Sequence, residues 1–197
     1  MLPVDVASTV EAVAELPGRI LVAYSMGVRL AWRVALERPY DLVVAISGTA
    51  GIADERARAA RVDADDALAA RIERDGVGPF LDMWGALPLF AGLRSRGEAW
   101  LTADRELRMV HRPEALAAAL RWLGQGAEPA IIDERLAAIT SPVLLLAGGT
   151  DPKYVAEAER LAGVLPNAHL AVHPTAGHAL VGEDPAWVAA QIEAGRP

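Results

Sequence analysis

Three residues have the types and the order along the chain that chemistry at a serine hydroxyl requires, namely Ser25, Asp151 and His178. A free serine hydroxyl is nearly inert, and it becomes a nucleophile or a base when a neighbouring histidine accepts its proton. A carboxylate on the other ring nitrogen orients that histidine and stabilises its charged form. The sequence therefore predicts a serine–histidine–aspartate triad that serves either acyl transfer or proton abstraction.

The residues around Ser25 indicate how its hydroxyl is presented. An apolar run rich in β-formers, Ile20–Tyr24, precedes the serine, and a helical pattern at residues 28–37 follows it. Ala23-Tyr24-Ser25-Met26-Gly27 is thus a small-x-Ser-x-Gly turn between a buried strand and a helix, the arrangement known as a nucleophile elbow. We expect its small residues to let strand and helix cross closely.

Asp151 and His178 each follow a predicted strand. Asp151 comes after the apolar run 143–147, and His178 comes after residues 169–172. Carboxyl ends of parallel strands share one edge of the sheet, where ligands bind in open α/β folds. We therefore expect both side chains to meet Ser25 there. Two alternatives stay open: Asp151 could simply cap the following helix, and another histidine could be the base (His111, His169 or His173).

The rest of the pattern predicts a parallel α/β sheet with a helical insertion. Buried strands are expected at 20–24, 42–46 and 143–147, the first of them buried on both faces, and a short fourth strand is expected at 169–172. Flanking helices are expected at 5–15, 28–37, 131–139, 154–165 and 185–194. Between the second and third strands, residues 52–129 show helical spacing only, with a loop at 87–90. We divide the chain into a first core part at 1–50, a helical cap at 51–130 and a second core part at 131–197.

Composition excludes several classes of protein. The 197 residues are 53% hydrophobic with a net charge of -7, which predicts a globular chain that does not bind nucleic acid. No cysteine is present, no apolar run has the length of a membrane span, and no group of side chains has metal-ligand spacing. We expect a cytoplasmic protein without cofactor or metal, either a monomer or a homo-oligomer.

One part of the acyl-transfer machinery is not found in this sequence. The backbone N–H of Met26 would supply one donor to an oxyanion hole. The second donor normally comes from a loop after an earlier strand, and no such loop lies upstream of Ser25. The expectation is that the chain begins inside the domain, with the first strands missing and one edge of the sheet bare.

With these elements in place, the chain resembles the α/β-hydrolases. More narrowly, it is similar to the family of 2-succinyl-6-hydroxy-2,4-cyclohexadiene-1-carboxylate synthases of menaquinone biosynthesis. The narrower resemblance rests on residues 24–31, 51–56, 80–90, 113–117 and 146–154. The stretch from Phe80 through Trp84 to Phe90 is more specific than the triad motifs, which fit many hydrolases. Ala23 and Val28 depart mildly from glycines that are common in the family.

The resemblance implies a lyase that eliminates pyruvate from a polycarboxylate cyclohexene substrate, with the triad serine acting as a base. It implies that Arg29, Arg61 and Arg108 hold substrate carboxylates and that Trp84 and Tyr24 line the pocket. Several other arginines offer the same chemistry nearby, namely Arg56, Arg58, Arg71 and Arg74 for Arg61, and Arg105 and Arg112 for Arg108.

Two other functions are compatible with the same residues. A serine hydrolase acting on a small ester, lactone or C–C bond would use the same triad through a covalent or tetrahedral intermediate. An inactive fragment or pseudoenzyme would explain the absent oxyanion loop. Labelling of Ser25 by a fluorophosphonate would favour the hydrolase, and a folded chain with no activity would favour the pseudoenzyme.

Overall fold

The computed structural model describes residues 5–196, and its centre is a four-stranded parallel sheet. The strands are β1 (Ile20–Tyr24), β2 (Leu42–Ile46), β3 (Val143–Gly148) and β4 (Ala168–His173). They lie in the order β1-β2-β3-β4, so β2 and β3 are neighbours although the whole insertion separates them in sequence. Their carboxyl ends therefore share one edge, as the sequence predicts.

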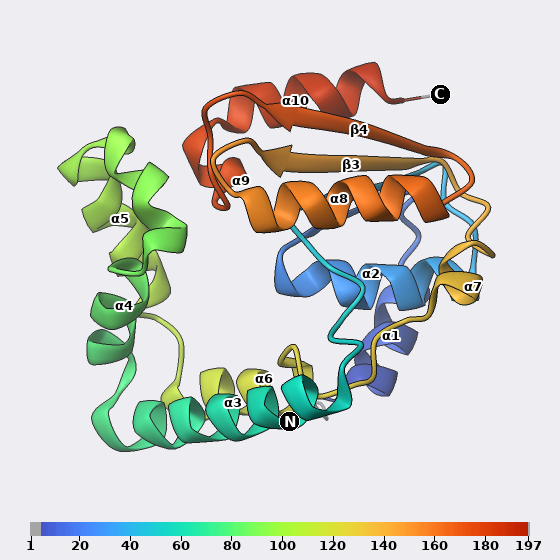
Figure 1. Ribbon diagram of the computed structural model, residues 1–197. Helices are drawn as coiled ribbons and strands as arrows, with labels where there is room; N and C mark the ends of the chain where they lie inside the picture. Colours follow the sequence, from blue (N-terminus) through green and yellow to red (C-terminus); the bar gives the residue numbers. More distant parts are fainter. Residues whose placement is uncertain (1–4, 197) are drawn as a thin grey trace.

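Helices cover both faces of this sheet (Figure 1). On one face pack α1 (Val6–Ala14), α2 (Met26–Glu37), α7 (Asp133–Leu136) and α8 (Pro152–Val164). On the other face pack α9 (Leu180–Glu183) and α10 (Pro185–Ala194). Alternate residues of β2 and β3 point into the two cores, so both strands are buried throughout. Such two-sided burial confirms the prediction of parallel-sheet strands from their continuous apolar runs.

Strand β1 is not buried on both faces, so that expectation was wrong. Val22 is 51% exposed and Tyr24 is 36% exposed. The reason is position, because β1 is the edge strand of the described sheet and hydrogen-bonds to β2 alone.

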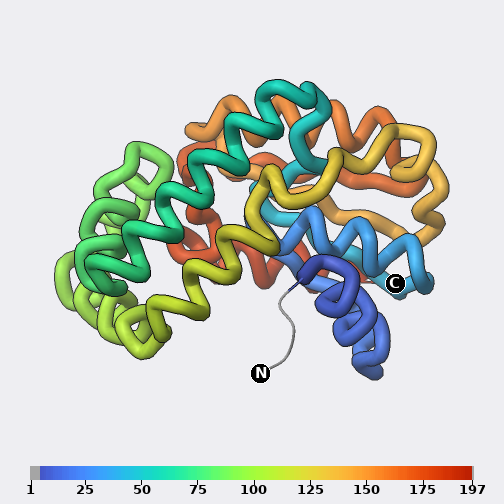
Figure 2. The backbone as a smooth tube through the Cα atoms, turned by 90° about the horizontal axis from the view of Figure 1, so that it is seen from below, coloured from blue at the N-terminus to red at the C-terminus, as the bar shows by residue number. Residues whose placement is uncertain are grey.

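Every element between β2 and β3 is a helix among the described residues, which confirms the prediction that this segment contains no strand. It comprises α3 (Glu55–Asp75), α4 (Val77–Gly85), the 3₁₀ helix η1 (Pro88–Arg96), α5 (Glu98–Arg108) and α6 (Pro113–Leu123). Helix α3 begins where the Asp54 side chain accepts a hydrogen bond from the Ala57 N–H, and it ends at Gly76 with a φ of 84°. Figure 2 shows α3 and α6 side by side, with α4 and α5 beyond their far ends.

Two local predictions were wrong. Residues 87–90 are not a plain loop, because η1 starts at Pro88, whose fixed φ suits the first turn of a helix. The helix expected at 131–139 is only the four-residue α7. Ile131 instead donates its N–H to the Ala50 carbonyl and is buried in an extended segment, so apolar residues there do not mark a helical face.

Candidate active site

Ser25 sits in a strained turn between β1 and α2. Its φ of 49° and ψ of -111° put a non-glycine residue in the left-handed half of φ/ψ space, which costs free energy and clusters at functional sites. The Ser25 N–H donates to the Ile46 carbonyl at 2.8 Å, which holds the turn against the end of β2. A Cβ atom at Gly27 would lie 3.8 Å from the Ala23 side chain. Strand and helix thus cross at van der Waals distance, in agreement with the predicted elbow.

The structure brings Ser25, His178 and Asp151 into one chain of hydrogen bonds. The Ser25 Oγ lies 2.9 Å from Nε2 of His178, and Nδ1 of His178 lies 3.0 Å from Oδ2 of Asp151. With Asp151 ionised, Nδ1 donates to the carboxylate and Nε2 accepts from the serine hydroxyl. Both His178 (2% exposed) and Asp151 (8% exposed) are buried, so solvent does not compete for these bonds. This arrangement can take a proton from Ser25.

The loops that carry Asp151 and His178 are joined by backbone contacts. The Thr150 N–H and hydroxyl both donate to the Ala176 carbonyl at 3.0 Å, and the Gly149 N–H donates to the His173 carbonyl at 2.7 Å. Any side chain at Gly148 would overlap the backbone of Gly177, so glycine is required there. These contacts fix the relative position of the carboxylate and the imidazole.

The surroundings of His178 favour its neutral form. Burial lowers the pKa of His178 below its usual 6.5, while Asp151 opposes that shift. Three rings surround the imidazole, with centroids at 4.4 Å for Tyr154, 5.7 Å for Tyr24 and 6.1 Å for Phe90. A neutral imidazole in an aromatic enclosure is suited to accept a proton at neutral pH.

Arg29 lies one turn into α2, and its side chain is half-buried. Its Nη2 donates to the Leu123 carbonyl at the end of α6, which connects the elbow helix to the insertion. Burial and the neighbouring Arg61 lower the pKa of Arg29 to about 10. The positive charge of Arg61 thus acts on Arg29, and an anion bound near both groups would relieve their repulsion.

Arg61 and Arg108 have different surroundings. Arg61 donates from Nε to Asp65 at 2.9 Å and from Nη1 to Gln125 at 2.7 Å. Arg108 is half exposed and forms two hydrogen bonds with Asp104 in its own helix. Its charge nevertheless reaches the site, because it opposes the burial that raises the pKa of Tyr24. Arg61 thus acts on Arg29, whereas Arg108 is half exposed and held by Asp104.

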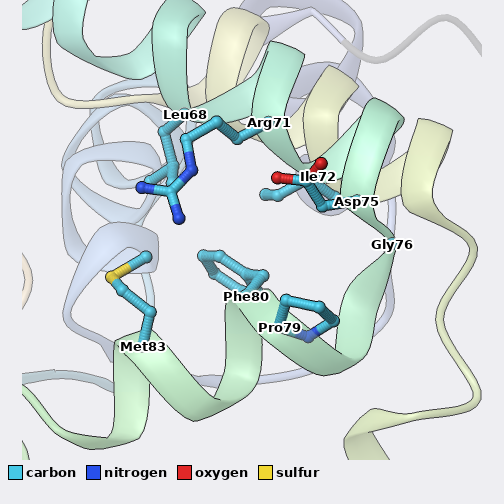
Figure 3. A pocket seen from close by; sticks show the side chains of 8 residues that line it. All are labelled: Leu68, Arg71, Ile72, Asp75, Gly76, Pro79, Phe80 and Met83. Carbon is cyan, nitrogen blue, oxygen red and sulfur yellow. The ribbon is translucent and has the colours of Figure 1, made fainter.

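Trp84 belongs to a series of aromatic contacts that leads from the insertion to His178. Its ring centroid lies 5.4 Å from Phe80 and 5.7 Å from Phe90, and Phe90 in turn contacts His178. Phe80 also lines a small pocket between α3 and α4, into which Arg71 and Met83 point (Figure 3). The remaining lining residues of this pocket are Leu68, Ile72, Asp75, Gly76 and Pro79. This pocket contains none of the three hydrogen-bonded residues, so it is distinct from the candidate active site.

Sequence reasoning missed several residues of the site. Tyr154 and Phe90 lay within motifs used for the resemblance, but neither was expected to contact His178. Glu183, five residues after His178, accepts a hydrogen bond from the Gly177 N–H at 2.8 Å. Asp65 was hidden among the acidic residues of α3, and its burial is the signal that only the structure supplies.

The competing histidine His173 has a local role. Its Nδ1 accepts hydrogen bonds from the Thr175 and Ala176 N–H groups, and its Nε2 lies 3.3 Å from Asp184. Asp184 caps α10 by accepting from the Trp187 N–H. Within residues 5–196 no three side chains are arranged to hold a metal ion, and no helix is both long and apolar enough to cross a bilayer.

Comparison with known proteins shows where this architecture recurs. A family model described as the alpha/beta hydrolase family matches residues 3–191. A Bacillus subtilis (strain 168) protein, provisionally named 2-succinyl-6-hydroxy-2,4-cyclohexadiene-1-carboxylate synthase, is 33% identical over 167 residues, which cover 84% of this chain and 61% of that protein. The synthase of that name from Salmonella heidelberg (strain SL476) is 34% identical, over 85% of this chain and 64% of its own length.

A solved structure agrees with these relatives. The structure of MenH from S. aureus superposes with a TM-score of 0.90 at 26% identity, covering 98% of this chain and 77% of that chain. The present chain spans less than two thirds of the length of the two curated relatives.

Proposed function

Because the chain belongs to the alpha/beta hydrolase family, we propose that it forms the catalytic part of a lyase of menaquinone biosynthesis. The reaction is elimination of pyruvate from a polycarboxylate cyclohexene, as in the synthase after which the relatives are named. The observation that carries the proposal is the hydrogen-bonded series Ser25–His178–Asp151 beside the paired cations Arg29 and Arg61. A base next to a carboxylate-binding site is what such an elimination requires.

In the proposed mechanism Ser25 draws a proton from a carbon of the substrate ring while its own proton passes to Nε2 of His178. The electron pair of that C–H bond forms a new ring double bond, and the C–O bond to the pyruvyl group breaks. The leaving group departs as the enolate of pyruvate, and it becomes pyruvate when its terminal carbon takes up a proton, for which the proton on His178 is available. Asp151 keeps the imidazole in the tautomer that accepts from serine, and it stabilises the imidazolium. No covalent enzyme intermediate is needed.

Substrate binding is assigned to the cationic and aromatic side chains around this base. Arg29 and Arg61 bind carboxylates through charge-assisted hydrogen bonds, and Arg108 does so from the rim. Trp84 and Tyr24 form apolar walls of the pocket, and the Met26 N–H at the start of α2 faces developing negative charge. In this scheme residues 51–130 act as a cap over the two core parts, 1–50 and 131–197.

The test is release of pyruvate from the synthetic cyclohexene substrate by the purified chain, followed with a coupled dehydrogenase. Ser25→Ala removes the base and is expected to abolish release. Ser47→Ala is a matched control, because Ser47 also follows a strand and has a positive φ of 48°. Its hydroxyl is buried and makes no hydrogen bond within the described residues, so activity should persist. Equal activity of wild type and Ser25→Ala would refute the proposal.

The same hydrogen-bonded series also supports hydrolysis of a small ester or lactone, with Ser25 as a nucleophile. The two functions differ in whether Ser25 forms a covalent bond to the substrate: the hydrolase forms an acyl-enzyme and the lyase does not. A fluorophosphonate that labels Ser25, together with turnover of simple esters and no release of pyruvate, would establish the hydrolase. Release of pyruvate without an acyl-enzyme would establish the lyase.

A further inference from the structure

Arg61 is held from two directions by side chains that come from different parts of the chain. Asp65, one turn along α3, accepts from its Nε at 2.9 Å. Gln125, in the segment after α6, accepts from its Nη1 at 2.7 Å. The amide nitrogen of Gln125 lies 3.4 Å from the Thr49 hydroxyl, which follows β2. The guanidinium is therefore fixed relative to the insertion and to the sheet, and Nη2 makes no hydrogen bond within residues 5–196.

Asp65 is unusual among the carboxylates of α3 because it is buried, with 6% of its surface exposed. One of its oxygens accepts from Arg61, and the other is buried without a hydrogen bond among the described residues. Burying a carboxylate with an unsatisfied oxygen costs free energy, so stability alone does not explain its presence. A Cβ atom at Gly124 would approach that oxygen to 2.6 Å, so the α6 end leaves room for the carboxylate.

The charge of Asp65 also acts on the cation pair. Arg61 lowers the pKa of Arg29, and Asp65 opposes that effect. The geometry agrees, because Arg29 donates to the Leu123 carbonyl and Arg61 donates to Gln125, only two residues further along. Two like charges held at the same segment repel each other and would separate if nothing held them. The buried carboxylate compensates one charge and keeps Arg61 near Arg29 in the absence of a bound anion.

We propose that Asp65 is a positioning residue, which with Gln125 pre-orients Arg61 so that Arg61 and Arg29 bind one carboxylate of the ligand. The inference rests on the proposed function for the identity of the full substrate, but a carboxylate site itself can be tested separately. Pre-orientation reduces the conformational entropy lost on binding. Loss of Asp65 should therefore weaken carboxylate binding while the proton transfer at Ser25 proceeds at nearly the same rate.

The first experiment is calorimetric titration of the 197-residue chain with succinate as the carboxylate probe. Asp65→Asn keeps the shape but removes the charge, and it is expected to weaken succinate binding about tenfold. The matched control is Glu55→Gln, because Glu55 also pairs with an arginine of α3, Arg58, but is fully on the surface. Glu55→Gln should leave succinate affinity within about twofold, as for most exposed pairs.

A double-mutant cycle shows whether Asp65 acts through Arg61. In an Arg61→Ala background, Asp65→Asn should no longer weaken succinate binding, since the group it positions is gone. An equal weakening in both backgrounds would overturn the proposal, as would unchanged affinity of the single variant or a wild-type chain that does not bind succinate. Gln125→Met removes the second acceptor without burying a charge, and it provides the same test if Asp65→Asn does not fold.

Kinetics then separate this inference from the proposed function. Where pyruvate release is measurable, Asp65→Asn should raise KM about tenfold with kcat changed less than about twofold. A fall in kcat with constant KM would overturn the positioning role. If the chain releases no pyruvate but the succinate cycle behaves as described, the positioning role of Asp65 stands and the lyase assignment fails.

Discussion

Gly92 of η1 lies directly against the carboxylate of Glu183, the residue that accepts a hydrogen bond from the Gly177 N–H. This contact joins the helical insertion to the loop that carries His178. Next to it, Gly182 packs against Leu93 and Trp100, so η1 and α9 meet through two glycines. The position of the His178 imidazole therefore depends on a helix of the insertion as well as on the sheet.

Gly92→Ala tests this dependence. The added methyl would overlap the Glu183 carboxylate, which must move and release the Gly177 N–H. A displacement of about 1 Å at a reacting group can cost a factor of about 100, so kcat should fall by about 10- to 100-fold. Gly85→Ala in α4 is the control, because a Cβ atom there meets nothing within 4 Å. Equal kcat values for the two variants would contradict the coupling.

Gly48→Ala should destabilise the fold. A methyl group at Gly48 would overlap the fully buried side chain of Val28 in the elbow helix, and overpacking of this kind costs about 1–3 kcal/mol. Gly163→Ala in α8 meets nothing within 4 Å and should stabilise the chain by about 0.5–1 kcal/mol through helix propensity. Chemical denaturation of the two variants and wild type measures both effects, and a stable Gly48→Ala would show that Val28 can move.

Activity should depend on pH through His178. The base must be neutral, and burial lowers the pKa of His178 below 6.5, so the acidic limb of kcat against pH should lie below 6.5. The unfolded chain binds this proton more readily than the folded chain, so stability is present above pH 6.5 and is lost as pH falls through the lowered pKa. A limb at or above pH 7 would contradict this assignment.

Asp151→Asn should lower kcat by about 10⁴-fold, since the imidazole loses both its orientation and the stabilisation of its charged form. The limb of the pH profile should move to still lower pH, because Asp151 opposes the effect of burial on the pKa of His178. Asp133→Asn, a change at an exposed carboxylate paired with Arg160, serves as the control. A variant of Asp151 with full activity would exclude it from the mechanism.

Arg29→Met should impair binding of a polycarboxylate much more than it impairs folding. Loss of a charge-assisted bidentate contact costs about 2–3 kcal/mol, which raises KM about 30- to 150-fold. Arg33→Met is the matched control one turn further along α2, where the guanidinium donates to the Pro129 carbonyl and lies 3.7 Å from Glu128. If the two variants have the same KM, Arg29 does not contact the substrate.

The parts of the fold that followed from the sequence are those with local signals. The bounds of β1 and β2 are as predicted, because continuous apolar runs end at turn residues in both cases. The exposure of β1 could not be predicted from its residues, which read as a buried strand, because exposure depends on strand order. The helix expected at 131–139 failed for a related reason, since its apolar residues are buried by long-range contacts and not by a helical face.

The residues of the candidate site also fall into those that a local sequence pattern indicates and those that only the structure shows. The hydrogen bonds of Ser25, His178 and Asp151 could be predicted, because the three residues occur in the order serine, aspartate, histidine and each follows a predicted strand. Residues that act through a neighbour, such as Asp65 and Glu183, have no local signature, because α3 contains several acidic residues with similar surroundings in sequence. Only burial and partners distinguish Asp65 from Asp63 or Asp66.

The hydrogen bond between Ser25 and His178 spans 153 residues of sequence, because the insertion and three of the four strands of the sheet lie between them. Closing so long a loop costs entropy that is recovered only when the sheet is assembled, and non-local contacts of this kind form slowly. Contacts between residues closer together in sequence can form the antiparallel pair α3 and α6. The same holds for α2, the helix that follows the elbow. During refolding, recovery of enzymatic activity should therefore lag behind recovery of helical circular dichroism. Activity would then report on the last step of folding, the assembly of the sheet.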